Sequence, residues 1–160
     1  MVRDADYADI GRFITAIASA ESATAKLWWH QSFSAGITLT TEKVQRTPMT
    51  DKLARLRELV ARDGSRLDQQ LAGLTDGFYR VVEPRHTLVH GFTNEVGLHP
   101  SAINLRNDHR VWMRDLPQLL PWADYVCRIA IQAYGDATRG IYEAELDIPP
   151  LGPIIACPED

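Results

Sequence analysis

A long helical stripe that runs into a short basic segment constrains the fold of this chain most. From Leu67 to Val82 the apolar residues recur at steps of three and four, which predicts the buried stripe of an amphipathic helix. The stripe continues into residues 83–91, EPRHTLVHG, where Arg85 stands at a position that the pattern reserves for an apolar side chain. A guanidinium stays charged and is seldom buried alone. We therefore expect a polar partner for Arg85.

Two histidines follow this arginine. His86 and His90 are four residues apart, one turn of helix, so both project from one face at the edge of the stripe. Pro84 removes a backbone hydrogen bond, which predicts either a kink near Arg80 or a new helix that begins at the proline. Gly91 follows His90 directly, close to a helix C-terminus, where the dipole favours a protonated imidazole.

The rest of the chain is predicted to be mostly helical. Helices are expected over residues 6–33, from 48–50 to a stop at 63–64, from a cap at 65, and from 116 to about 137. Residues 34–47 read as a connection with room for a short helical turn. Between residues 92 and 115 the helical period is lost, and we predict a β-hairpin of roughly 103–106 with 110–114. The charged residues of the second helix are interpreted as a solvated face: Lys52, Arg55, Arg57, Glu58 and Arg62.

A carboxylate also stands on an apolar stripe. Glu21 lies one turn after Ile17 on the core-facing side of the first predicted helix. A carboxylate there is costly unless it is paired, so Glu21 is a candidate partner for Arg85 or for one of the histidines. The alternative is a partly exposed glutamate at the edge of the stripe.

Length and composition fit one domain. The 160 residues are 45% apolar and 24% charged, which is ordinary for a globular protein. We predict a helical domain over residues 1–140 and an acidic, proline-rich tail over 141–160. The sequence lacks an apolar run of the ~20 residues that a membrane span needs, so no membrane partner is expected. Neither a secretory signal nor a disulfide framework is indicated, which favours the cytoplasm.

Charge is distributed unevenly along the chain. The net charge of −4 argues against a general nucleic-acid coat protein. Residues 80–114 nevertheless carry five arginines against three carboxylates, whereas residues 136–160 carry one arginine against six. The segment around Arg85 is therefore locally basic and suited to a phosphate-bearing ligand. An ordinary solvated surface with uneven charge is the alternative.

The spacing Arg85-x4-His90, with a polar residue after the arginine and a glycine after the histidine, resembles the motif of HEPN-family domains. Many of these small helical domains are metal-independent RNA endonucleases. The order of predicted elements resembles the family over roughly residues 5–138. The resemblance implies an all-α fold, a HEPN-like bundle of about four to five helices with a β-hairpin inserted before the last long helix.

RNA cleavage is chemistry that these residue types can perform. RNA supplies its own nucleophile, the 2′-hydroxyl, so a ribonuclease needs a base, an acid and positive charge on the phosphorane. The resemblance implies that His90 transfers protons and Arg85 stabilises charge, with His86 in a supporting or substrate-binding role. Glu21, the candidate partner of Arg85 or of a histidine, is expected to act in the same supporting way. The resemblance also implies a homodimer with a shared cleft, 2′,3′-cyclic phosphate products and no cofactor. An Abi-like or toxin-like defence role would add an antitoxin as a possible protein partner.

Two other interpretations stay open. In the first, the chain is a non-catalytic binding or scaffold module of the same fold, and Arg85 and His90 make structural hydrogen bonds at the dimer interface. In the second, His86 and His90 form half of a zinc site, because their spacing suits two ligands on one helix face. The sequence offers no evident third ligand, so no metal is expected.

Overall fold

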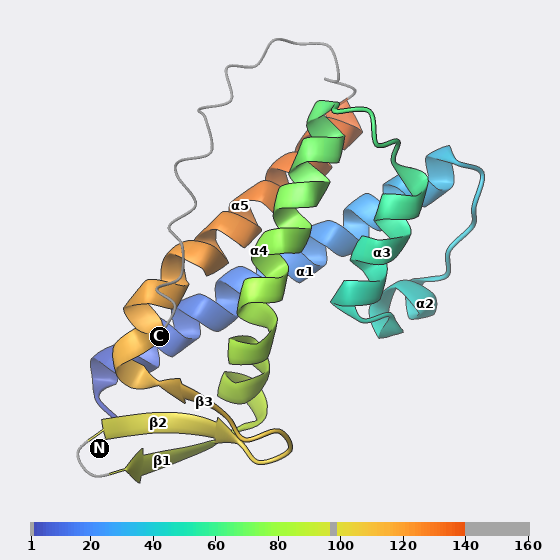
Figure 1. Cartoon of the computed structure of the whole chain (residues 1–160). Coiled ribbons are helices and arrows are strands. Elements are labelled where there is room, and N and C mark those ends of the chain that lie inside the picture. The colour runs from blue at the N-terminus through green and yellow to red at the C-terminus, as the bar shows by residue number, and fades with distance from the viewer. Residues whose placement is uncertain (1, 97–98, 140–160) are drawn as a thin grey trace.

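The computed structural model describes residues 2–96 and 99–139, so the predicted acidic tail, 141–160, lies outside the described residues. The described chain is mostly helical, as predicted, with a small antiparallel sheet before the last helix (Figure 1). The elements in order are α1 (Asp4–Ser34), α2 (Thr41–Arg46), α3 (Met49–Leu59), α4 (Arg66–His90), β1 (Phe92–Val96), β2 (His99–Asn104), β3 (His109–Trp112), a 3₁₀ turn (Met113–Asp115) and α5 (Leu116–Arg139).

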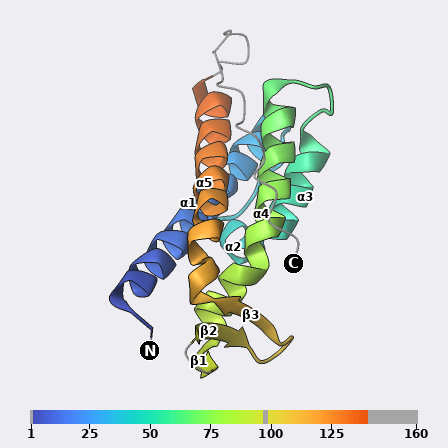
Figure 2. The same ribbon diagram turned by 60° about the vertical axis from the view of Figure 1, so that its left-hand side comes forward.

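The three long helices α1, α4 and α5 form the body of the molecule, and α3 packs along α1 and α4 (Figures 1 and 2). Apolar side chains from these four helices bury one another in one continuous core. The stripes predicted from helical spacing supply most of it, because residues three or four apart share a helix face. Fully buried members include Phe13, Ile17, Leu27, Leu53, Leu56, Leu71, Leu74, Phe78, Val81 and Val126.

Small residues allow α4 and α5 to approach closely. A Cβ atom at Gly77 would lie 2.9 Å from Val126 Cγ2, and one at Gly73 would lie 2.5 Å from the Tyr125 hydroxyl. Side chains at these two positions would therefore push the helices apart. The spacing of four places both glycines on the same face of α4.

Helix starts agree better with the sequence than helix ends. Ser65 caps α4 as predicted, and its hydroxyl accepts a hydrogen bond from the Asp68 amide at 3.3 Å. The second predicted helix was expected to stop at residues 63–64, but α3 ends at Leu59. The next residue, Val60, is extended and buried, so packing of its side chain takes precedence over continued helix.

Pro84 lies inside α4, which is one continuous helix over Arg66–His90. Of the two predicted outcomes, a kink or a new helix at the proline, the second is wrong. A proline removes one backbone hydrogen bond, and packing of the surrounding stripe on α1, α3 and α5 holds the helix together across it.

The predicted hairpin is present as part of a three-stranded antiparallel sheet in the order β1-β2-β3. Strands β2 and β3 pair Ile103 with Arg110 and Asn104 with His109, so both strands begin and end earlier than the predicted 103–106 and 110–114. The turn between them places Asp108 at φ 57°. Strand β1 was not predicted, because its short sequence FTNEV contains a residue typical of turns. It follows α4 almost immediately and joins the sheet at the end of the bundle (Figure 1).

Candidate functional site

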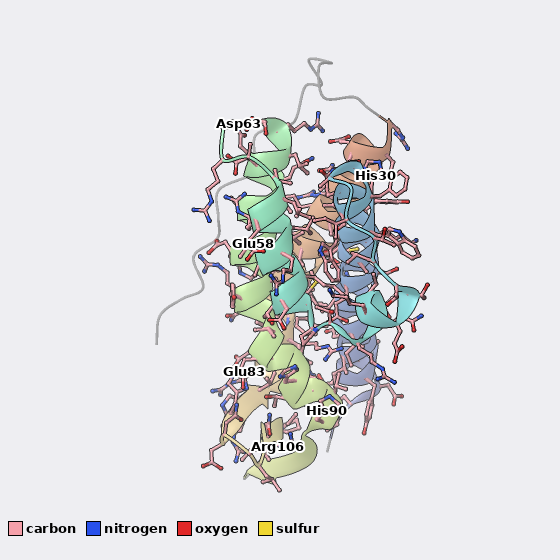
Figure 3. All side chains as sticks on the ribbon, turned by 90° about the vertical axis from the view of Figure 1, so that its right-hand side faces the viewer. His30, Glu58, Asp63, Glu83, His90 and Arg106 are labelled. Atoms are coloured by element: carbon pink, nitrogen blue, oxygen red, sulfur yellow. The ribbon has the colours of Figure 1, made fainter. Side chains whose placement is uncertain are left out.

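The C-terminal end of α4 is fixed against the sheet. Thr87 is fully buried, and its hydroxyl is hydrogen-bonded to Nδ1 of His109 at 2.6 Å. Asn107, in the turn before β3, donates a hydrogen bond from its side-chain amide to the Glu83 carboxylate. Glu83, His90 and Arg106 all lie at the sheet end of the molecule (Figure 3). These contacts set the direction in which the basic segment of α4 presents its side chains.

Arg85 has the polar partner that its place on the stripe predicts. Its Nη2 atom lies 3.4 Å from Oε2 of Glu21 on α1, as a hydrogen bond and ion pair. The two side chains are 26% and 28% exposed, so this contact stands at the edge of the core and is open to water. Glu21 therefore agrees with both alternatives, because it pairs with Arg85 and is also partly exposed.

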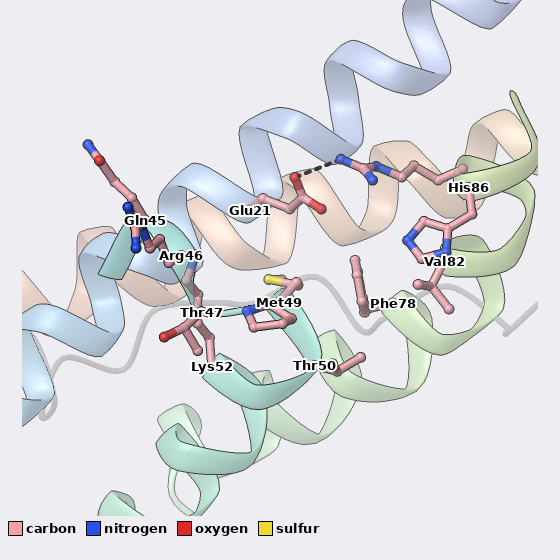
Figure 4. Close-up of a pocket in the computed structure, with 12 residues that line it drawn as sticks. Glu21, Gln45, Arg46, Thr47, Met49, Thr50, Lys52, Phe78, Val82 and His86 are labelled. Atoms are coloured by element: carbon pink, nitrogen blue, oxygen red, sulfur yellow. Dashed lines mark hydrogen bonds and ion pairs between the residues drawn. The ribbon is translucent and has the colours of Figure 1, made fainter. Parts of the chain in front are cut away.

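A groove of about 310 Å³ opens beside this ion pair. It lies between α1, the end of α2, α3 and α4, with Glu21 and His86 both on its wall (Figure 4). Of the described residues that line it, three are cations, Arg46, Lys52 and Arg85, and one is a carboxylate, so these residues favour an anionic ligand. The remaining lining residues are Gln45, Thr47, Pro48, Met49, Thr50, Phe78 and Val82.

Lys52 corrects the prediction of a solvated face on the second helix. It is only 7% exposed, and it lines the groove. Burial lowers the pKa of its ammonium below the ordinary 10.5, and the nearby Glu21 carboxylate opposes that shift. The sequence held a signal for this, because Lys52 lies three residues after Met49 and four before Leu56, both of which are buried.

We predict that Lys52→Met raises the free energy of unfolding at neutral pH by about 1 kcal/mol, because it removes a desolvated charge at similar volume. The folded state binds the Lys52 proton more weakly than the unfolded chain does, so wild-type stability rises as pH increases from the lowered pKa toward 10.5. The advantage of the variant should therefore shrink over that interval. Urea unfolding of both proteins at neutral and alkaline pH measures the difference.

Lys43→Met is the matched control, because it makes the same change on the exposed surface of α2, outside the groove. We expect it to alter stability by less than about 0.5 kcal/mol at either pH. A wild-type protein more stable than Lys52→Met at neutral pH would contradict the prediction and assign the ammonium a net stabilising role.

The two histidines are exposed and adjacent on α4. Their ring centroids are 6.2 Å apart, and the rings are inclined at 61°. His86 lines the groove together with Arg85, whereas His90 is not among the residues that line it. Five residues rotate a helix by about 140° relative to its start, so Arg85 and His90 point in different directions from α4. Within one chain, the structure does not bring this pair into one groove.

Other side chains near the groove were not singled out by sequence reasoning. Arg46 lines it from α2 and also pairs with Glu42 at 3.0 Å, and Thr47 and Thr50 contribute hydroxyl groups. They lie far from Arg85 in sequence, in and beside a connection without a motif. Only the return of α3 along α4 places them next to the basic segment.

Among the described residues, no group of three or more histidine, cysteine or acidic side chains is placed to hold a metal ion. No described helix combines the length and the apolar character that crossing a bilayer requires. Comparison of the chain with protein-family models, with curated proteins and with solved structures found no match. The candidate site is therefore defined by the residues of this chain alone. Arg85 and Glu21 are paired, Lys52 and His86 line the same groove, and His90 is exposed next to His86.

Proposed function

We propose that this protein is a metal-independent RNA endonuclease that acts as a homodimer. The observation that carries the proposal is the end of α4, where exposed His86 and His90 stand beside a half-buried Arg85 that is held by Glu21. The likeness of Arg85-x4-His90 to the HEPN motif supports the same chemistry, as does the excess of cations in the adjoining groove.

A two-fold arrangement would bring the separated parts together. The outward face of α4 carries Tyr79 and Val89, which are 59% and 40% exposed, in addition to the two histidines. Exposed aromatic side chains such as Tyr79 are enriched in surfaces that pack on a partner. Two copies that meet along this face would place Arg85 of one protomer near His90 of the other, which one chain alone does not do.

In such a cleft each component has a defined task. One His90 takes the proton of the 2′-hydroxyl while the 2′-oxygen attacks phosphorus. The imidazolium formed in this way then gives its proton to the departing 5′-oxygen, so each composite site needs one Arg85 and the His90 of the other protomer. The Arg85 guanidinium stabilises the negative charge that accumulates on the phosphoryl oxygens, because its planar fork matches two of them. The products are a 2′,3′-cyclic phosphate end and a 5′-hydroxyl end.

The test is cleavage of structured and unstructured RNA with and without EDTA, together with sedimentation to establish the oligomeric state. Cleavage that survives EDTA, is performed by a dimer and leaves cyclic phosphate ends is the expected result. Cleavage that requires a divalent metal, or that a stable monomer performs, would overturn the mechanism.

A non-catalytic module of the same fold is the second candidate, and one observation favours it. The Arg85–Glu21 ion pair joins α4 to α1 within one chain, which a purely structural arginine would also do. This candidate predicts a well-folded dimer that binds RNA or protein but leaves every RNA of a broad panel intact.

A further inference from the structure

Among the residues that the structure describes, Lys52 is a nearly buried cation without a hydrogen bond that would account for its position. Lys52 as a whole residue is only 7% exposed. None of the hydrogen bonds or ion pairs within residues 2–96 and 99–139 involves its ammonium group. Removal of a cation from water is costly unless it is paired, and ionisable groups in such surroundings are concentrated at functional sites. Lys52 is one of the residues that line the groove, so a ligand there would lie against its side chain.

The N-terminus of α3 opens into the same groove. Thr47, Pro48, Met49 and Thr50 form its wall, and the cap residue Pro48 makes no side-chain hydrogen bond to the first turn. The first amide groups of a helix have no partner within the helix and carry partial positive charge, which suits an anion. Lys52 lies within the first turns of this helix, so the ammonium and the amides are presented by one rigid element.

Among the described residues, Glu21 is the only carboxylate that lines the groove. It pairs with Arg85 at 3.4 Å, a long contact for a charge-assisted hydrogen bond, and its charge also acts on Lys52. The carboxylate thus partly neutralises two cations, with one long hydrogen bond to Arg85 and none to Lys52. An incoming anion with several oxygens could satisfy both cations better than this single carboxylate does.

We propose that the groove between α1, α3 and α4 binds a phosphate group through Lys52 and the N-terminus of α3, with Glu21 as the internal anion against which phosphate competes. The identity of this phosphate rests on the proposed function: it belongs to the RNA strand and lies next to the linkage that is cleaved. Lys52 is then a substrate-binding residue that the Arg-x4-His motif does not contain.

The first measurement is titration with inorganic phosphate at constant ionic strength, followed by amide shifts of residues 49–52 in NMR spectra. Lys52→Met should weaken binding about tenfold or more, because a hydrogen bond to a charged group is lost. Glu21→Gln should strengthen binding several-fold, because it removes the competing charge. Lys43→Met, which removes an exposed lysine outside the groove, should leave affinity unchanged. Circular dichroism verifies that each variant is folded.

The second measurement uses a short RNA and the His90→Ala background, in which the strand stays intact. Lys52→Met should weaken RNA binding and reduce the slope of log affinity against log salt by about one, as loss of one phosphate contact requires. Equal phosphate affinity for Lys52→Met and Lys43→Met, or no gain from Glu21→Gln, would overturn the site. Phosphate binding through Lys52 without any effect on RNA would overturn its assignment to the RNA strand.

The two proposals can fail separately. Phosphate titration requires neither cleavage nor a dimer, so a protein that binds phosphate through Lys52 but cuts no RNA would refute the nuclease proposal alone. Conversely, RNA cleavage that depends on Arg85 and His90 but is unchanged by Lys52→Met would refute the phosphate site alone.

Discussion

A mixture of Arg85→Ala and His90→Ala protomers is expected to recover RNA cleavage that neither variant shows alone. Each single variant should lose at least about 100-fold in rate, because it lacks either the charge on the phosphorane or the proton-transfer group. In one chain, Arg85 faces Glu21 and the groove, whereas His90 is exposed and does not line that groove. The proposed site therefore takes its arginine and its histidine from different protomers.

The expected recovery follows from two-fold symmetry. A dimer of the two variants has one composite site without either group and one with both intact. Random exchange of subunits gives about half mixed dimers, so the mixture should reach about a quarter of wild-type activity. Single-turnover cleavage of a labelled RNA measures it, after native mass spectrometry has confirmed subunit exchange.

Two controls make the result specific. Arg55→Ala removes an exposed arginine that pairs with Glu58 on α3, outside the groove, and should leave cleavage within about twofold of wild type. A mixture of His90→Ala with the double variant lacking both groups should stay inactive, because every composite site then lacks its histidine. Inactivity of the first mixture, despite proven mixed dimers, would contradict a site shared between protomers.

Gly91→Ala is expected to lower the free energy of unfolding by about 3 kcal/mol. Gly91 ends α4 at a φ of −82°, which alanine adopts freely, so the effect comes from contacts alone. A Cβ atom there would collide with the carbonyl oxygen of Thr87 and lie 2.7 Å from that of Ile103. Both neighbours are backbone, so relief requires residue 91 to shift away from the last turn of α4 and β2 to move away from residue 91. Urea unfolding measures the loss.

The same substitution at Gly11 is expected to change the free energy of unfolding in the opposite direction. Gly11 lies within α1, and a Cβ atom there would meet nothing within 4 Å, so Gly11→Ala should stabilise the protein by about 0.5–1 kcal/mol. Because Gly91 follows His90 directly, the Gly91→Ala variant should also lose cleavage, through displacement of the imidazole. If the free energy of unfolding of Gly91→Ala lies within about 0.5 kcal/mol of the wild-type value, the contact between α4 and β2 adapts easily and the prediction is wrong.

Local patterns were sufficient to predict most of the helices. The apolar stripes of α1, α4 and α5 follow directly from helical spacing, and Ser65 caps α4 as its sequence indicates. Such signals are local, since each depends on residues within a few turns of one another. The partner of Arg85 was also within reach, because a cation and a carboxylate that both stand on buried stripes need each other.

The groove could not be predicted in the same way. Lys52 looked like one charged residue among several on a polar helix, and only the packing of α3 on α1 and α4 buries it beside Glu21. Strand β1 was missed because hydrogen bonds to β2, which its own sequence does not specify, make it a strand.

The sequence by itself determined the helices, the basic segment at residues 83–91 and the need of Arg85 for an anion, because spacing and charge are properties of the chain. Only the tertiary structure decided that Arg85 contacts Glu21, that Lys52 lines the same groove and that His90 does not line it. Burial and distance between α1, α3 and α4 depend on how the helices pack, and periodicity within one helix carries no record of its neighbours.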